Sequence, residues 1–314
     1  MRTRRLGTHG PEVGAIGYGA MVLNWEYGTP VGTSEATAVV HRALDLGVTL
    51  IDTADAYGPN EELVGQTLQG RRDESVLSTK VGLVVSGADP ITYENNGSPE
   101  HIRTSIDESL RMLETDYIDI YHLHRVDPDV PVEESVGAMA ALVEAGKVGG
   151  IGLCEADADT LERAQTVHPL TTVQSELSLW TRGALAEVVP WCESHGVAFL
   201  PFSPLGRGYL TGRLDRSDLD SNDWRTQLPR FSEDAMDANR RIVEGISEVA
   251  ARHDATNAQI ALAWLLAQSP AIVPIPGTKR LRYLEENAAA ADLDLSETDL
   301  TDLDALPDPV GGRY

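Results

Sequence analysis

Short apolar runs alternate with longer amphipathic segments along the whole chain, and this alternation constrains the fold most strongly. Runs rich in β-branched residues predict buried strands, and segments with helical spacing of apolar residues predict helices between them. Strands that alternate with helices form a parallel sheet. Eight such units in 314 residues favour an α/β fold of the closed (β/α)8, or TIM, barrel type. The expected strands are residues 15–21, 48–51, 75–79, 117–123, 148–153, 171–175, 197–201 and 271–274.

Further elements complete this architecture. Residues 2–14 predict an N-terminal β-hairpin, and residues 281–291 and 297–305 predict short helices that form a C-terminal helical extension. Residues 84–97 and 207–231 are long and polar and predict loops, the second of them a mobile flap or substrate loop. No linker is visible, so we expect one domain over residues 1–314. The other expected helices are 35–46 with Ser34 as N-cap, 60–68, 98–113 with Ser98 as N-cap, 132–145, 158–167, 185–194, 234–253 and 257–268.

Charge and composition exclude several function classes. The formal net charge is -24, which excludes the basic face that a nucleic-acid-binding protein needs and disfavours an anionic membrane surface. No apolar run approaches the roughly 20 residues of a membrane helix, and the N-terminus has no signal-peptide core. The two cysteines make no disulfide framework, so we expect a cytoplasmic protein. An anionic ligand of such an acidic chain must be met by a local basic cluster.

Four polar side chains follow three successive strands, where the active site of a barrel lies. Asp52 ends the second strand, Tyr57 lies in its loop, Lys80 ends the third strand and His124 ends the fourth. A nearby ammonium lowers the pKa of a phenol. We expect Lys80, held by Asp52, to act on Tyr57 in this way, with His124 orienting a substrate carbonyl. The set resembles a proton donor to a carbonyl oxygen, so a hydride must come from a cofactor.

Each of these residues also has a structural interpretation. Asp52 at a strand end is typical of a loop anchor, and Tyr57 in a loop is typical of packing. His122 and His124 point to the same side of their strand, so periodicity does not choose between them and only the strand tip favours His124. Lys80 is harder to explain structurally, because a buried lysine requires a partner and the chain has only three lysines.

A second candidate cluster follows the last two strands. Residues 203–208 and 276–280 are rich in Gly, Ser and Pro, and the second loop opens a short helix. Barrels bind phosphate at this place, where small residues let backbone N–H groups approach the anion. Lys279, Arg280 and Arg282 would supply positive charge. The alternative is a pair of ordinary loops beside a solvated basic run. No third glycine follows Gly17 and Gly19, which disfavours a Rossmann dinucleotide site.

Taken together, the motifs resemble the aldo-keto reductase family over essentially the whole chain. The matching stretches are residues 47–54 with Tyr57 and Gly58, 78–80, 116–121 with Leu123 and His124, 174–176, 202–206, 275–278 and 285–287. The resemblance implies a (β/α)8 barrel, NADPH/NADP+ as cofactor, no metal, and reversible reduction of aldehydes or ketones. It also implies that Asp52, Tyr57, Lys80 and His124 form the catalytic tetrad.

The same resemblance implies a set of cofactor contacts. Gln174 would hold the carboxamide, Phe202 would stack on the nicotinamide, residues 203–208 would hold the pyrophosphate, residues 278–280 would lie near the 2′-phosphate, and Glu286 and Asn287 would lie at the adenine. Cys154, Glu155 and Leu177 depart from the family pattern, as does His122 where Gln is frequent. The full expected set is Gly19, Ala20, Met21, Asp52, Cys154, Gln174, Phe202, Ser203, Pro204, Leu205, Gly206, Arg207, Gly208, Gly277, Thr278, Lys279, Arg280, Glu286 and Asn287.

The sequence therefore predicts an NADPH-dependent reductase of small-molecule carbonyl compounds with Tyr57 as proton donor. Two alternatives stay open: an NADPH-sensing regulatory subunit with slow turnover, and a barrel lyase that forms a Schiff base on Lys80. The physiological substrate and the oligomeric state are not predicted, and the substrate specificity is expected to lie in residues 84–97 and 207–231.

Overall fold

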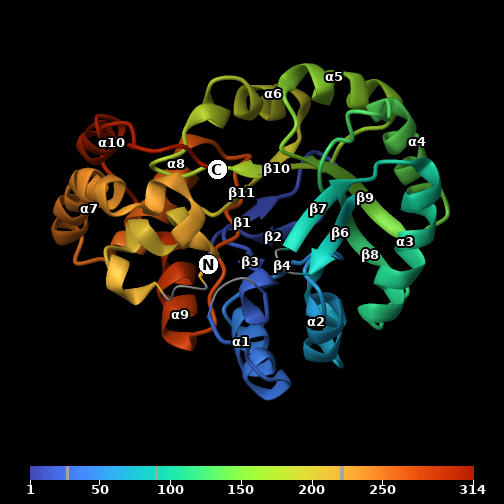
Figure 1. Ribbon diagram of the computed structural model, residues 1–314, viewed down its shortest axis with the longest axis horizontal. Helices are drawn as coiled ribbons and strands as arrows, with labels where there is room; N and C mark the ends of the chain where they lie inside the picture. The colour runs from blue at the N-terminus through green and yellow to red at the C-terminus, as the bar shows by residue number, and fades with distance from the viewer. Residues whose placement is uncertain (26–27, 89–90, 220–222) are drawn as a thin grey trace.

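The computed structural model describes residues 1–25, 28–88, 91–219 and 223–314. Within them, seven parallel strands follow one another around a barrel with helices outside (Figure 1). Neighbouring strands are in the order β3, β4, β5, β8, β9, β10 and β11, so each barrel strand pairs with the next barrel strand along the chain. Their bounds are β3 (Tyr18–Gly19), β4 (Leu50–Asp52), β5 (Val76–Val81), β8 (Ile118–Leu123), β9 (Val148–Cys154), β10 (Thr172–Glu176) and β11 (Ala198–Phe202).

Residues 271–276 close the ring between β11 and β3. On one side, Val273 N donates to Phe199 O at 2.8 Å and Ile275 N donates to Pro201 O at 3.1 Å. On the other side, Gly17 N donates to Pro274 O at 2.9 Å. This segment occupies the position of the expected eighth strand but pairs only through an isolated bridge, because Pro274 and Pro276 have no N–H to donate. The arrangement is that of the expected (β/α)8 barrel.

The N-terminal hairpin closes one end of the barrel. β1 (Thr3–Arg5) and β2 (Glu12–Gly14) pair antiparallel, as the sequence predicts. Leu6 and Val13 from this hairpin are buried against Leu50 and Ile120 of the strands. A larger apolar cluster fills the space between the outer faces of the strands and the helices. Both faces of the sheet are therefore covered, which explains why β5 is buried throughout and β8 is buried at every residue except Asp119.

The helices alternate with the strands as expected, and three match the expected ranges residue for residue. Ser98 caps its helix by accepting from His101 N. Ser34 is not the N-cap of the first helix, because Gly32 is extended and its carbonyl already accepts from Ala36 N. The helices are α1 (Thr33–Asp45), α2 (Asn60–Leu68), α3 (Pro99–Met112), α4 (Val132–Glu144), α5 (Ala158–Val167), α6 (Val188–His195), α7 (Glu233–Arg252), α8 (Asn257–Gln268), α9 (Leu281–Ala289) and α10 (Glu297–Asp304).

Two expected loops and one strand differ from the prediction. Residues 84–97 are not a loop: β6 (Leu83–Ala88) and β7 (Ile91–Asn95) form an antiparallel hairpin, because the β-branched and aromatic residues around Val85 and Tyr93 pair across it. Residues 89–90 lie outside the described residues. The described parts of 207–231 form short 3-10 turns, and residues 220–222 are again outside the description. The expected strand 15–21 is short, since a 3-10 turn begins at Ala20.

Candidate active site

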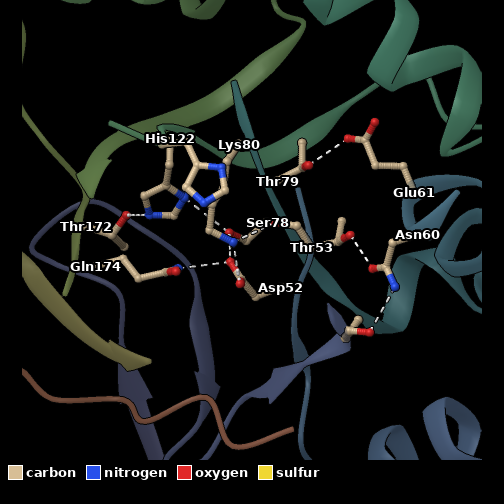
Figure 2. A network of polar contacts seen from close by, with 12 residues as sticks. Asp52, Thr53, Asn60, Glu61, Ser78, Thr79, Lys80, His122, Thr172 and Gln174 are labelled. Atoms are coloured by element: carbon tan, nitrogen blue, oxygen red, sulfur yellow. Dashed lines mark hydrogen bonds and ion pairs between the residues drawn. The ribbon is translucent and has the colours of Figure 1, made fainter. Parts of the chain in front are cut away.

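A buried ion pair lies at the end of two neighbouring strands. Asp52 is the last residue of β4, and Lys80 lies near the end of β5. Lys80 Nζ lies 2.6 Å from Asp52 Oδ2 and 2.6 Å from the carbonyl oxygen of Thr53 (Figure 2). Lys80 is 0% exposed and Asp52 4% exposed. The strand geometry therefore brings together the acid and the base that the sequence predicts as partners.

Asp52 is held by two further donors. Ser78 Oγ donates to Asp52 Oδ1 at 2.8 Å, and Gln174 Nε2 donates to the same oxygen at 3.0 Å (Figure 2). Ser78 lies on β5 and Gln174 lies on β10, across the barrel. A carboxylate with this many donors keeps one orientation, so the position of Lys80 is also fixed.

The loop that carries Tyr57 is held at both ends by buried hydrogen bonds. Thr53 Oγ1 donates to Asn60 Oδ1 at 2.6 Å, and Asn60 Nδ2 donates to the carbonyl oxygen of Ala20 at 3.0 Å. Asn60 is the first residue of α2 and is fully buried. The segment between these two anchors has little freedom, which holds Tyr57 over the strand ends.

In this position Tyr57 lies beside Lys80 and His124. Lys80 Nζ lies 5.3 Å from the centre of the Tyr57 ring. The rings of Tyr57 and His124 are 5.6 Å apart and meet edge to face at 85°. All four residues of the predicted tetrad therefore gather at one rim of the barrel, and Asp52, Tyr57 and His124 line the cavity that opens there.

The two histidines of β8 and its end have different environments. His122 lies in the barrel interior, where its ring nitrogens lie 2.8 Å from Thr172 Oγ1 and 3.3 Å from Ser78 Oγ (Figure 2). Burial lowers the pKa of His122 to about 4. His124 lines the cavity, and burial together with the charge of Lys80 holds the pKa of His124 well below its usual range. Both imidazoles are neutral at pH 7, and only His124 faces a ligand space.

The cavity above the tetrad is large, about 1050 Å³. Ligand cavities commonly span about 300–1,000 Å³, so this one has room for a dinucleotide cofactor together with a small molecule. It extends from the tetrad to the start of α9. Of the expected cofactor residues, those that line it are Gly19, Met21, Asp52, Gln174, Phe202, Ser203, Pro204, Leu205, Arg207, Gly208, Gly277, Thr278, Lys279, Arg280, Glu286 and Asn287.

Three expected cofactor residues lie behind the cavity wall. Ala20 is 0% exposed and supplies the carbonyl that anchors Asn60. Cys154 is buried, and burial raises the pKa of its thiol to about 12, which keeps it protonated. Gly206 is buried with φ +57°, and an added Cβ would meet the Trp180 ring at 2.7 Å. The structure brings the other sixteen together but not these three.

The far end of the cavity is basic and its backbone is closely packed. An added Cβ at Gly277 would lie 2.6 Å from Gly19 O, so these two loops approach as only glycine allows. Lys279 Nζ donates to Thr29 O at 2.7 Å. Arg280 lies over the Tyr283 ring at 5.4 Å, and Arg213 lies over it at 5.0 Å while pairing with Glu286 at 3.1 Å.

The C-terminal tail also reaches the cavity, which the sequence did not indicate. Arg313 pairs with Glu155 and, at 3.2 Å, with Glu176. Arg207 also pairs with Glu176 at 3.2 Å, so its side chain binds a carboxylate although it lines the expected pyrophosphate loop. Tyr314 lines the cavity and packs 5.1 Å from the Arg207 guanidinium. Residues 306–314 belong to no expected helix, strand or motif, so no pattern in the sequence indicated that Arg313 and Tyr314 reach the cavity.

Other wall residues were also missed. Leu83 and Tyr93 come from the hairpin that was expected to be a loop, and Arg125 directly follows His124. Their positions depend on strand ends that polar composition did not reveal. Seven further wall residues lie within the segments expected as substrate and phosphate loops, namely Thr211, Arg213, Leu214, Asp218, Trp224, Arg225 and Pro276. The wall residues outside the expected segments and the expected cofactor set also include Val22, Ala258, Ile275, Tyr283 and Tyr314.

The described residues offer neither a site for a metal ion nor a membrane-spanning helix. No group of three or more His, Cys, Asp or Glu side chains among residues 1–25, 28–88, 91–219 and 223–314 is arranged to hold a metal ion. In the same residues, no helix has both the length and the apolar character required to cross a membrane.

Comparisons with known proteins show the family of the chain. The sequence model of the Aldo/keto reductase family matches residues 15–308, and the chain belongs to this family. Probable aldo-keto reductase 1 of Glycine max is 43% identical over 316 residues, which cover 99% of this chain and 91% of that protein. The chain is an oxidoreductase that acts on carbonyl compounds.

Solved structures extend the comparison to the fold. The glycerol dehydrogenase AKR11B4 of Gluconobacter oxydans has a TM-score of 0.89 at 25% identity, covering 99% of this chain and 98% of that one. The thermostable aldo-keto reductase Tm1743, solved with the inhibitor epalrestat, has a TM-score of 0.77 at 30% identity, covering 98% of this chain and 100% of that one.

Proposed function

We propose that the protein reduces aldehydes or ketones to alcohols with NADPH as the hydride donor and Tyr57 as the proton donor. The observation that carries the proposal is the position of the Lys80 ammonium, 5.3 Å from the Tyr57 ring and paired with Asp52 at 2.6 Å. A fixed positive charge beneath a phenol favours the phenolate that remains after proton transfer. The Tyr57 hydroxyl proton then passes to the carbonyl oxygen of the substrate.

The other tetrad residues support this transfer. Asp52 keeps Lys80 in place, since removal of the carboxylate would leave the ammonium without its charge partner. His124 is neutral, so one ring N–H can donate a hydrogen bond to the carbonyl oxygen without bringing a second positive charge. Asp52, Lys80 and His124 are buried, which strengthens the interactions among their charges and dipoles.

The wall residues fit NADPH. When bound, NADPH supplies the hydride to the carbonyl carbon. The side-chain N–H of Gln174 donates a hydrogen bond to Asp52, which leaves the amide oxygen of Gln174 free to accept from a carboxamide N–H. Phe202 offers a ring to the nicotinamide, and Ser203, Leu205 and Gly208 line the stretch of the cavity proposed for the pyrophosphate. Lys279 and Arg280 would meet the 2′-phosphate that distinguishes NADPH from NADH.

A panel of carbonyl compounds tests this proposal. Purified protein is mixed with NADPH and aromatic, aliphatic and sugar aldehydes, and oxidation of the cofactor is followed by absorbance. The Gluconobacter relative is named a glycerol dehydrogenase, so oxidation of polyols with NADP+ belongs in the panel. We expect steady turnover with at least one simple aldehyde. Absence of turnover in both directions, with NADPH still bound, would instead support a redox-sensing regulatory subunit.

A Schiff-base lyase is disfavoured by the surroundings of Lys80. Its Nζ is engaged by Asp52 and the Thr53 carbonyl and is fully buried, so an incoming carbonyl carbon has no access. The single-domain organisation over residues 1–314 and the cytoplasmic location stay predictions.

A further inference from the structure

The substrate end of the cavity holds an arginine that the proposed chemistry does not use. Arg125 directly follows His124 and lines the cavity with Tyr57. Its Nη1 donates to the carbonyl oxygen of His124 at 2.6 Å, and no described residue offers it a carboxylate. A guanidinium has five N–H donors in a planar fork, so one backbone bond leaves most of this donor capacity unused.

The other charged residues of the cavity wall contrast with Arg125. Arg207 pairs with Glu176, Arg213 with Glu286, and Arg225 with Asp223. Among the cavity arginines in the described part of the chain, only Arg125 and Arg280 form no ion pair with a carboxylate. Arg280 lies at the end proposed for the 2′-phosphate. Arg125 lies at the opposite end, beside the tetrad.

The acids of the wall do not compensate Arg125. Asp52 is paired with Lys80, and Glu286 is paired with Arg213 and Arg282. Asp218 accepts from the backbone N of Asp215 at 2.8 Å. In a chain of net charge -24, an arginine in a cavity without an acidic partner is a positive charge reserved for a ligand.

Arg125 is also close to the reacting position. Successive Cα atoms are about 3.8 Å apart, and the side chain turns back to the carbonyl of His124, so its charge stays beside the imidazole. This charge contributes to the low pKa of His124 and acts on Cys154. Leu83, Tyr93, Phe202 and Tyr314 supply apolar and aromatic surface to the same cavity wall.

We infer that the substrate is a carbonyl compound that carries a carboxylate, bound by the Arg125 guanidinium while its carbonyl faces Tyr57 and His124. The inference rests on the proposed reductase function and names its substrate class. The carboxylate takes no part in the reaction: the hydride still goes to the carbonyl carbon and the Tyr57 proton to its oxygen. The apolar wall would hold the carbon skeleton between the two groups.

Matched substrate pairs test this inference. The first pair is 4-carboxybenzaldehyde and methyl 4-formylbenzoate, and the second is pyruvate and methyl pyruvate; the two members of each pair differ mainly in the charge. We expect the wild-type protein to show a kcat/KM at least about tenfold higher for the acid in at least one pair, as for a charged hydrogen bond. Arg125→Met should remove this preference through KM, and Arg125→Lys should restore part of it. Arg111→Met, on the exposed face of α3, is the matched control and should leave kcat/KM unchanged for both members of each pair.

The outcomes separate this inference from the function on which it rests. Turnover without preference for the acid in either pair, or a preference that survives Arg125→Met, would overturn the inference and leave the reductase intact. If no compound is turned over, or if Arg125→Met does not fold, the inference is tested by the binding of benzoate and benzamide to wild-type protein saturated with NADP+. Calorimetry should then show benzoate binding at least about tenfold more tightly than benzamide, and equal binding would overturn the inference.

Discussion

Lys80 Nζ lies 2.6 Å from Asp52 Oδ2, and both side chains are almost completely shielded from water. Two charges in such a place are stable only together, because each alone would be buried without compensation. The pair also lies directly beneath Tyr57. It therefore links the stability of this corner of the barrel to the chemistry proposed for the phenol.

The ion pair should behave as one unit in denaturation experiments. Lys80→Met or Asp52→Asn alone leaves a buried charge or its donors unpaired, and each should lower the free energy of unfolding by about 3–5 kcal/mol. The double variant should lose less than the sum of the two. Urea denaturation of the four proteins gives the coupling. Additive losses would show that the two residues do not depend on each other.

His122 should make the protein sensitive to acid. The unfolded chain takes up a proton on this imidazole near its usual pKa of about 6.5, whereas the folded chain does so only near 4. Stability should therefore be intact above about pH 6.5 and be lost as the pH falls towards 4. The Gln side chain of the His122→Gln variant does not titrate. Between pH 7 and pH 5 the free energy of unfolding of this variant should therefore fall by about 2 kcal/mol less than that of the wild type. Urea denaturation at both pH values measures this difference, and equal losses would contradict it.

Lys279 should distinguish the two nicotinamide cofactors. Lys279→Ala removes a charge from the proposed 2′-phosphate site, so it should weaken NADPH binding about 10- to 100-fold and change NADH binding little. Lys147→Ala is the control, because Lys147 pairs with Asp107 outside the cavity. Fluorescence titration gives all the dissociation constants. A similar loss of affinity for NADPH and NADH would show that Lys279 does not bind the 2′-phosphate.

The barrel and the gathering of Asp52, Lys80 and His124 at one rim were predictable because both follow from local patterns. Apolar runs identified the strands, and the barrel rule then placed Asp52, Lys80 and His124 at one rim. The hydrogen bonds that Asp52 accepts from Ser78 on the neighbouring strand and from Gln174 across the barrel were not predicted, because strand register decides them. The expected eighth strand was located correctly, but its prolines prevent regular pairing.

The outer walls of the cavity were less predictable. The hairpin of β6 and β7 looked like a polar loop, since Gly, Asn, Asp and Pro interrupt its short runs of strand-forming residues. Tyr314 reaches the cavity through tertiary contacts alone, among them the hydrogen bond that the side-chain Nδ2 of Asn239 donates to Val310 O at 3.0 Å. Arg125 lies next to a predicted residue, but only the absence of a carboxylate partner among the described residues distinguishes it.

The most direct test of the account is Tyr57→Phe, which removes the proposed proton donor and keeps the ring. With an aldehyde that wild type reduces, kcat should fall at least about 100-fold, as expected for loss of a general acid. The NADPH dissociation constant, measured by fluorescence on the same preparation, should stay close to that of wild type. A Tyr57→Phe protein with wild-type kcat would show that the proton comes from another group.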